Sequence, residues 1–371
     1  MRKMTSNEIR SLWIKYFEEH GHKYVESAPL IPRDDDSLLW INAGVTPLKK
    51  YFDGTVIPES RRIVNIQKCI RTNDIENVGV TRRHHTFFEM MGNFSIGDYF
   101  KNEAISFAFE LLTSDKWFAI PKDRLYVTVY TNDADALNKW IELGMDPSHM
   151  IKLDENFWEI GSGPCGPDSE IFFDRGEKYD PNHDAFEKFK NDDEQERYIE
   201  IWNNVFSQFQ SEEGKPREKY KELPHKNIDT GAGLERWCTI FQDVDSSFET
   251  DLFTEESTGI QKLFAFLCPF LDIISKGKIL ICDELETSLH ESLLYTLLKT
   301  FLSLNGKEQS QIIFTTHDTS LLSLDLFRRD QIWFTELNSL NRSTELYSLA
   351  EIKSVRKDEN YGKGYISGRY G

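Results

Sequence analysis

The chain has 371 residues, which is enough for two domains by size. Its composition, 39% hydrophobic and 13% aromatic, predicts a well-filled core, and its formal net charge of −18 argues against a broad nonspecific nucleic-acid surface. Local basic patches at residues 49–50, 82–83 and 215–226 remain compatible with specific RNA binding. No apolar run approaches the roughly 20 residues that span a bilayer. The N-terminus lacks the apolar stretch of a secretory signal, so we expect a cytoplasmic protein with no membrane partner.

The cysteines show neither CxxC pairs nor the histidine spacing of a zinc site. We therefore expect no metal site and no disulfide framework, and we interpret the thiols as small buried hydrophobes. The five residues are Cys69, Cys165, Cys238, Cys268 and Cys282.

The first predicted element is an N-terminal helix. Thr5 and Glu8 form a T-x-x-E capping box at its start, and Gly21 suits its end. Between them, apolar residues recur at helical spacing: Ile9, Leu12, Trp13, Tyr16 and Phe17. Further helices are expected near residues 103–112 and 135–143.

Runs rich in aromatic and β-branched residues alternate with these helices and predict strands. They occupy residues 38–42, 62–67, 87–94, 125–130, 169–173 and 198–209. The connections contain many turns and few full-length crossover helices, which favours an α+β fold with a largely antiparallel sheet and flanking helices. The acidic, polar residues 177–196 are expected to form a surface insertion.

The pattern changes after Phe253. Buried-type strands are predicted at residues 278–282 and 311–315, with an amphipathic helix at 288–304 between them, which is typical of a parallel α/β sheet. Two more strands are predicted at 331–335 and 345–349. We therefore expect two domains, residues 1–253 and 254–371.

Two segments of the first half suit phosphate binding. In residues 69–76, Arg71 offers a forked set of donors that matches phosphate oxygens. In residues 82–94, His84 and His85 lie on a loop from which they could contact outer phosphates. On chemistry alone, a polar hairpin with incidental charge remains an alternative.

Two further segments suit a small substrate. Trp158 supplies an apolar wall beside the Gly- and Pro-rich residues 161–170, which we interpret as a loop that brings backbone close to a partner. Asn203 and Val205 share one face of a predicted strand, so that one amide stands beside one branched methyl group. Plain core and an ordinary half-buried strand are the alternatives.

A fourth segment, residues 227–236, combines charge with glycine. Asp229 can hold an ammonium group, and Gly231 and Gly233 allow close approach to the backbone before a helix begins. Arg236 would direct a cation back toward the site. Short glycine patterns are common, so a helix-capping turn remains an alternative.

Taken together, these segments resemble the alanine branch of the class II aminoacyl-tRNA synthetases. The runs RHHTFFEMMGNFSIGDYFK, GPCGPDSEIFFDRG and IDTGAGLER are close to that family's sequence, and the resemblance extends from Met1 to Phe253. It implies an antiparallel class II sheet. It also implies activation of L-alanine with ATP and Mg²⁺ to alanyl-adenylate, and transfer of the alanyl group to the 3′ end of tRNA(Ala).

The resemblance implies a role for each candidate residue. Arg71 and Arg236 match the arginines that hold ATP and are the implied catalytic residues. The implied ATP-binding residues are Arg71, Glu76, His84, His85, Gly231, Gly233 and Arg236. The implied alanine-binding residues are Trp158, Asn203, Val205 and Asp229.

The second half resembles the C-terminal part of ABC-type ATPases found in bacterial defence modules. The runs ESTGIQK (256–262), KILICDE (278–284) and IFTTHD (313–318) are similar to the signature, Walker B and switch-histidine segments, which implies an ATPase-like half-site of Asp283, Glu284 and His317. No G-x-x-x-x-G-K-[ST] loop is present to hold the outer phosphates. We therefore expect an inert partial P-loop ATPase-like lobe, unstable unless the first half or a protein partner covers it.

No segment resembles the tRNA-binding, editing or oligomerisation domains of the synthetase family. We therefore expect weak tRNA charging, and adenylation of serine and glycine as well as alanine. A non-enzymatic binding or regulatory module and a non-functional fusion remain alternatives. A natural gene fusion, a recombination product and an artificial chimera are equally compatible with the sequence.

Overall fold

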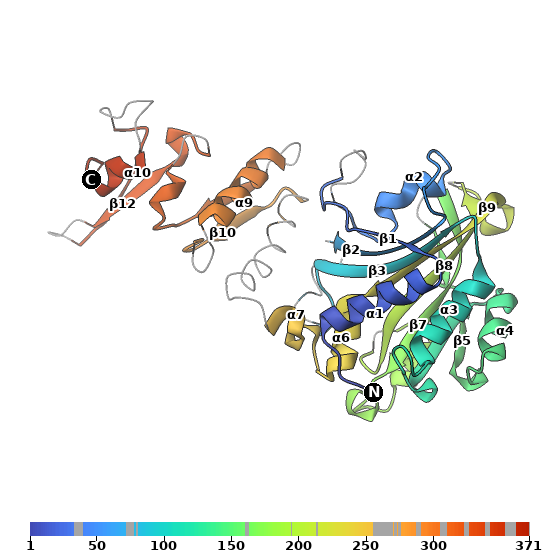
Figure 1. Ribbon diagram of the computed structural model, residues 1–371. Coiled ribbons are helices and arrows are strands. Elements are labelled where there is room, and N and C mark those ends of the chain that lie inside the picture. Colours follow the sequence, from blue (N-terminus) through green and yellow to red (C-terminus); the bar gives the residue numbers. More distant parts are fainter. Residues whose placement is uncertain are drawn as a thin grey trace. The chain divides into compact units, whose positions relative to one another are not determined.

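The computed structural model divides the chain into two compact units, Met1–Glu255 and Glu256–Gly371. Figure 1 shows the elements of each. The residues that the structure describes are 1–32, 40–71, 78, 81–159, 163–193, 195–212, 214–254, 270, 273, 276–286, 291–304, 310–322, 326–337, 342–352 and 361–370. Within them, no helix combines the length and the apolar character that crossing a bilayer requires.

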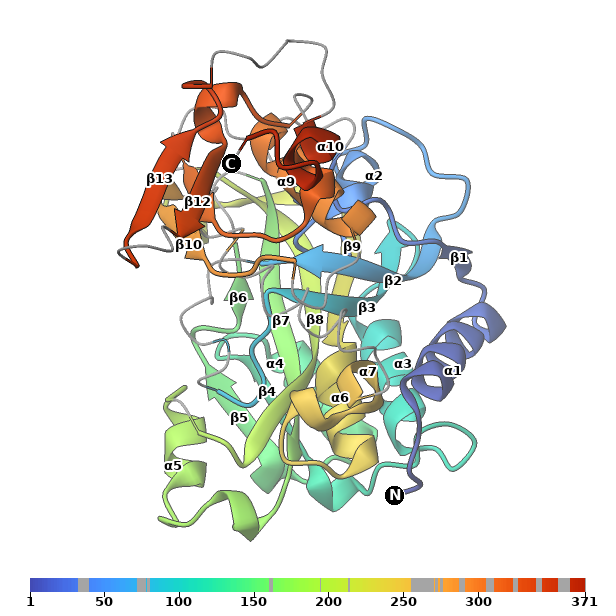
Figure 2. The same ribbon diagram turned by 90° about the vertical axis from the view of Figure 1, so that its left-hand side faces the viewer.

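A nine-stranded sheet organises the first unit, with strand order β1-β2-β3-β9-β8-β7-β4-β5 and β6 paired to β7. Its central strands run side by side in both ribbon views (Figures 1 and 2). All pairings are antiparallel except β1–β2 and β4–β5, which confirms the expected antiparallel-dominated α+β sheet. The strands are β1 (Lys23–Val25), β2 (Arg62–Ile70), β3 (Phe87–Ile96), β4 (Leu125–Tyr130), β5 (Met150–Leu153), β6 (Phe157–Trp158), β7 (Gly163–Asp174), β8 (Tyr198–Ser211) and β9 (Lys221–Gly233).

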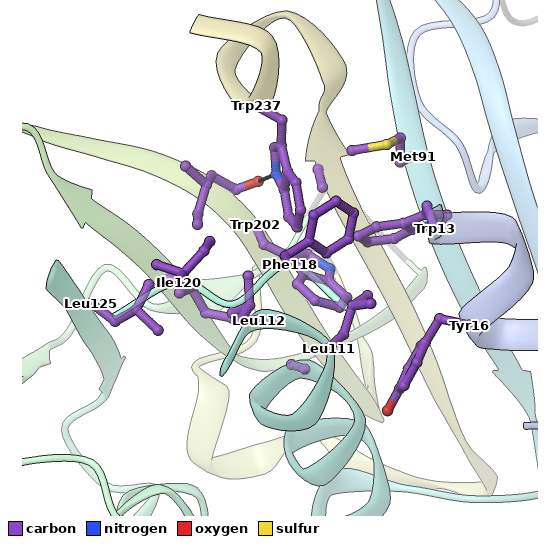
Figure 3. Close-up of a cluster of buried hydrophobic side chains, with 14 of the residues drawn as sticks. Trp13, Tyr16, Met91, Leu111, Leu112, Phe118, Ile120, Leu125, Trp202 and Trp237 are labelled. Atoms are coloured by element: carbon purple, nitrogen blue, oxygen red, sulfur yellow. Dashed lines mark hydrogen bonds between the residues drawn. The ribbon is translucent and has the colours of Figure 1, made fainter. Parts of the chain in front are cut away.

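The helices of the first unit are α1 (Ser6–Glu19), α2 (Lys49–Phe52), α3 (Lys101–Thr113), α4 (Ala134–Glu142), α5 (Ala185–Lys190), α6 (Leu234–Gln242) and α7 (Asp251–Thr254). Helices α1, α3, α4 and α6 cover one face of the sheet and bury the main core, whereas α2 and α5 pack on the other face. Trp13 of α1 lies 4.5 Å from Trp202 of β8 and 5.6 Å from Trp237 of α6, measured between ring centroids (Figure 3). Rings of this size bury much apolar area, so they fasten both helices to the sheet.

The start of α1 confirms the predicted capping box. The Glu8 amide donates to Thr5 Oγ1 at 3.3 Å, and the Thr5 amide donates to Glu8 Oε2 at 2.8 Å. Each side chain thus satisfies a backbone donor that the first turn leaves without a partner. Gly21, with a φ of 79°, adopts the left-handed conformation just beyond the helix end.

The structure corrects several sequence-based expectations. Of the strand predicted at residues 38–42, residues 40–42 are not in a strand, and residues 38–39 lie outside the described residues. The Gly- and Pro-rich segment expected to be a loop belongs, from Gly163 onward, to β7. A Cβ on Gly166 would lie 2.0 Å from the Phe206 carbonyl oxygen, so the close partner of this backbone is strand β8. Gly231 and Gly233, for which a helix-capping turn was the alternative, form the end of β9, and α6 begins directly after them at Leu234.

The predicted surface insertion, residues 177–196, contributes to the core. It contains helix α5, whose Ala185 and Phe189 are buried and pack with Tyr198 of β8. Its charged residues are mostly exposed, which explains why composition alone favours an exterior loop.

In the second unit, β10 (Ile279–Cys282) pairs in parallel with β11 (Gln311–Phe314). Helix α9 (Glu291–Leu304) stands between them in sequence, so the predicted strand–helix–strand order and its parallel pairing are confirmed. Strands β12 (Trp333–Leu337) and β13 (Thr344–Ser348) form an antiparallel pair, and α10 covers Tyr361–Ile366.

Candidate active site

The face of the sheet opposite the main core carries the candidate residues of β8 and β9. Residues directly opposite each other in antiparallel strands project to the same face. Asn203 of β8 lies opposite Gly231 of β9, and Val205 lies opposite Asp229. Two rows therefore run across β7, β8 and β9: Glu170, Asn203 and Gly231 in one, and Asp168, Val205 and Asp229 in the other.

Arg71 stands at the end of β2, beyond Cys69. Its backbone amide donates to the Thr86 carbonyl at 2.8 Å, and its Nε donates to the Asn42 carbonyl at 2.9 Å. The guanidinium carbon lies 5.2 Å from the centre of the Phe88 ring. Backbone and ring contacts thus hold a cation that keeps its remaining N–H donors for a ligand.

Asp229 is the carboxylate between Arg71 and the β8 residues. Burial raises its pKa to about 7, and the positive charge of Arg71 acts in the opposite direction. A carboxylate that loses hydration in this way gains from a bound cation, because the cation restores the stabilisation that water supplied. Such a site suits a substrate ammonium group.

Gly231 and Gly233 differ in how closely neighbouring atoms approach them. A Cβ on Gly231 would lie 2.9 Å from Met90 Sδ, which is closer than Cβ atoms normally approach. A Cβ on Gly233 would meet only Arg236, at 3.9 Å. Gly231 therefore keeps the floor of the site flat beside Met90.

Asn203 is held by two carboxyl groups. Its Nδ2 donates to Asp168 Oδ2 at 3.0 Å and to Glu170 Oε1 at 3.3 Å. Asn156, next to β6, also hydrogen-bonds through its side chain to both carboxyl groups. Asp168 and Glu170 were not among the predicted site residues, although their spacing of two on a strand places them on one face.

Burial and neighbouring charges raise the pKa of both carboxyl groups. Burial raises the pKa of Asp168 to about 6, with a further rise from the charge of Glu200. Burial, followed by the charges of Glu200 and Asp168, raises the pKa of Glu170 well above its usual range. The β7 side of the site is therefore rich in acceptors and disfavours a second anion.

Trp158 and Arg236 occupy other positions around these rows. Trp158 pairs with Gly166 at the β7 edge and is half-buried. Arg236, in the first turn of α6, donates through Nη1 to Glu200 Oε2 at 2.6 Å and to the Glu200 carbonyl at 3.1 Å. Its cation is thus partly engaged by β8, which the sequence motif did not reveal.

The two histidines lie between β2 and β3 but in different surroundings. His84 Nδ1 lies 2.6 Å from the Thr81 hydroxyl. His85 stacks on Phe253 at 5.3 Å and meets Phe248 edge-on at 4.6 Å, measured between ring centroids. Burial and then the nearby charge of Arg236 lower the His85 pKa to about 4, so this imidazole is neutral at pH 7. Glu76, the remaining candidate, lies outside the described residues.

In the second unit, Asp283, Glu284 and His317 are brought together at the ends of β10 and β11. The Thr315 hydroxyl donates to Asp283 Oδ1 at 2.5 Å and accepts from the Glu284 amide at 2.8 Å. His317 Nε2 lies 3.9 Å from Glu284 Oε1. The three side chains are exposed.

Comparison with known proteins gives the family. The family model described as "tRNA synthetases class II (A)" matches residues 8–266, and the chain belongs to this family. The match extends past residue 253, the expected end of the first domain, into residues 255–266, which lie outside the described part.

Curated relatives share the first part of the chain. Alanine–tRNA ligases from Streptococcus mutans and Streptococcus gordonii are each 58% identical over 263 residues, which cover 71% of this chain and 30% of each relative. The chain thus spans less than a third of the length of the relatives it matches. Among solved structures, the pyrrolysyl-tRNA synthetase PylSc of Desulfitobacterium hafniense matches at 13% identity with a TM-score of 0.37, over 67% of this chain and 73% of that one, a likeness too small to bear on the assignment.

Proposed function

We propose that the first unit activates L-alanine with ATP to alanyl-adenylate and transfers the alanyl group to the 3′ end of tRNA(Ala). The observation that carries this proposal is the cross-strand arrangement of Asp229, Asn203 and Val205 on one face, with Arg71 as the cation near Asp229. The names of the curated relatives supply the substrate. The Val205 side chain and the flat backbone at Gly231 suit a substrate with a very small side chain.

The chemistry follows from the charges. The alanine carboxylate, ionised at pH 7, attacks the α-phosphorus of ATP; the new oxygen–phosphorus bond forms as the bond to pyrophosphate breaks. Negative charge grows on the phosphoryl oxygens, and the Arg71 guanidinium, held in place before the reaction, would stabilise it. No general base is required of the protein.

Mg²⁺ would enter the site bound to ATP, as part of the nucleotide substrate. Among the described residues, no three His, Cys, Asp or Glu side chains gather as a ligand set for a metal ion. Mg²⁺ bound to ATP would neutralise phosphate charge, since this ion is usually held by substrate phosphates with few carboxylates. No step of the proposal depends on a metal site in the protein.

ATP–pyrophosphate exchange tests the activation step. The parent protein should exchange label in the presence of L-alanine, and Arg71→Ala should lower kcat/KM by about a hundredfold or more, as loss of a preorganised cation does. Arg61→Ala, which removes an exposed arginine before β2, is the matched control and should leave exchange within about twofold. No exchange by the folded parent would favour the non-enzymatic alternative.

We further propose that residues 254–371 form a partial ABC-type ATPase lobe that a protein partner covers. The parallel β10–β11 pair and the Asp283–Thr315–Glu284 contacts support the first part. Ile279, Ile281 and Ile313, exposed by 57–76%, support the second.

ATP hydrolysis should be absent or unchanged by Glu284→Ala. Turnover that survives Arg71→Ala and disappears with Glu284→Ala would contradict the expectation of an inert half-site.

A further inference from the structure

The pairing of β3 with β9 is interrupted beside Asp229. The strands pair at Met90 and Met91 and again at Ser95 and Ile96, in one unchanged register, but not over residues 92–94. In this register the interruption lies opposite residues 229–231, which include the carboxylate and one glycine of the candidate site. On its β3 side, β9 therefore lacks backbone pairing at these residues, whereas on its other side residues 229–231 stay paired with β8.

Side chains bridge the interruption on the opposite, helix-covered face. Asn93 and Thr230 face each other at its centre. The Thr230 hydroxyl donates to Asn93 Oδ1 at 2.6 Å, and the Asn93 backbone amide donates to Thr230 Oγ1 at 3.0 Å. These two bonds replace the backbone exchange expected of this pair.

The hydrogen bonds of this bridge continue into the core, and from Asn93 inward each donor points away from Thr230. Asn93 Nδ2 donates to the Tyr99 hydroxyl at 3.0 Å, and that hydroxyl lies 2.8 Å from His22 Nε2. His22 Nδ1 lies 3.1 Å from the Phe17 carbonyl, which can only accept, so Nδ1 carries the proton. Burial lowers the His22 pKa to about 4, so Nε2 carries no proton at pH 7 and accepts from Tyr99.

Every member of this chain of hydrogen bonds is at most 4% exposed. The Ser95 hydroxyl donates to the Tyr99 carbonyl at 2.6 Å and accepts from the Tyr99 amide at 2.8 Å, which ties Tyr99 to β3. In a buried chain each donor faces one acceptor, so no link can rotate without leaving a polar atom without a partner, at considerable cost. The amide of Asn93 is thereby locked in the orientation that receives Thr230.

We propose that Thr230, Asn93 and Tyr99 are positioning residues of the substrate site: their hydrogen-bond chain, anchored at His22, sets the distance between β3 and β9 and hence the place of Asp229. The proposal deepens the alanine-activating function proposed above and rests on it for its kinetic test. The three residues touch no substrate and act through Asp229 and Gly231.

The test replaces the Thr230 hydroxyl without changing side-chain volume. Thr230→Val should raise the KM for alanine in pyrophosphate exchange about tenfold, the loss expected when a hydrogen bond to a charged ligand is misplaced, with the KM for ATP within about twofold. Thr230→Ser keeps the hydroxyl and should restore the KM for alanine. Tyr99→Phe should act in the same direction, and its effect combined with Thr230→Val should be smaller than the product of the two.

Thr239→Val is the matched control. Thr239 is also a buried threonine, whose hydroxyl donates to the Glu235 carbonyl at 2.8 Å, but it lies on α6 rather than on β9. This variant should lower thermal stability about as much as Thr230→Val and leave the KM for alanine unchanged. Equal KM changes in both valine variants, or a folded Thr230→Ser without rescue, would overturn the proposal.

A second measurement does not depend on activity. The carboxyl carbon of Asp229, labelled with ¹³C and assigned with Asp229→Asn, can be titrated by NMR in the ligand-free protein. Thr230→Val should move its midpoint by about half a pH unit or more, because the carboxylate changes its distance to Arg71, whereas Thr239→Val should not. If the parent shows no exchange, the proposed function fails, and an unchanged midpoint would separately overturn the positioning role.

Discussion

Burial gives single residues of this protein properties that their identity does not predict. A solvated aspartate is ionised well below neutral pH, yet burial brings the pKa of Asp229 to about 7. A solvated histidine titrates near neutrality, yet burial keeps His85 neutral, with a pKa of about 4. His85 can therefore offer a hydrogen bond to a phosphate but no charge, whereas Arg71 supplies charge throughout.

The Asp229 carboxyl group predicts how activity depends on pH. Below its pKa the group is neutral and no longer attracts an ammonium ion, so kcat/KM for alanine should fall about tenfold per unit as the pH decreases below about 7. Pyrophosphate exchange between pH 5.5 and 8.5, at saturating MgATP, measures this. A profile that stays flat to pH 5.5 would show that Asp229 is not the ammonium ligand in its ionised form.

At the level of elements, sequence patterns predict the longer helices and most strands, but not α5, the short strands β1, β5 and β6, or the glycine-containing strand β9. The capping box and apolar spacing predict α1 closely, because both arise within one turn or two. Gly163, Gly166 and Pro167 indicate a loop, yet they lie in β7 because the Phe206 backbone of β8 approaches Gly166 too closely for any side chain. That cause lies 40 residues away in the chain, where no local pattern records it.

Helix α6 carries a buried acid that couples stability to pH. Burial raises the Glu235 pKa to about 8, although the side chain accepts a hydrogen bond from the Glu89 amide at 2.9 Å. Its pKa is higher in the folded than in the unfolded chain. The folded state therefore holds a proton that the unfolded state releases, and this contribution is lost as the pH rises from about 4.5 toward 8.

Glu235→Gln should remove this dependence. The free energy of unfolding of the variant, relative to that of the parent, should increase by on the order of 2 kcal/mol as the pH rises from 6 to 9. Urea denaturation at both pH values measures the difference, and the exposed Glu187→Gln on α5 serves as the control. If the variant and the parent differed by the same free energy of unfolding at both pH values, Glu235 would not be protonated in the folded state.

At the scale of the whole molecule, two units of different architecture share one chain. The first unit has the antiparallel-dominated class II sheet, and its family match covers residues 8–266. The second has a parallel pair, β10–β11, and an antiparallel pair, β12–β13. The chain spans 30% of the length of its alanine–tRNA ligase relatives, and the activity proposed above concerns the site in the first unit.

The residues proposed to bind alanine predict limited selectivity in the activation step. Val205 is the apolar residue opposite Asp229, and rejecting glycine depends on the contacts of one methyl group. Such a difference gives only about 10–200-fold discrimination, and an added hydroxyl is excluded no better. Pyrophosphate exchange with glycine and serine, each compared with alanine, should show kcat/KM values within that range of the alanine value. Undetectable exchange with both would contradict the prediction.

Short-range patterns in the sequence are enough to predict the α+β class of the first unit and the positions of α1, β2, β3, β4 and β8, because periodicity and short motifs are local. The roles proposed for the ATP- and alanine-binding residues come from the resemblance to the synthetase family. The folded sheet is needed to see that Asp168 and Glu170 hold the Asn203 amide, that Glu200 engages Arg236, and that side chains rather than backbone join β3 to β9 beside Asp229. These contacts join residues that are 33 to 137 positions apart in the chain, and their register and burial are set by the packed sheet as a whole.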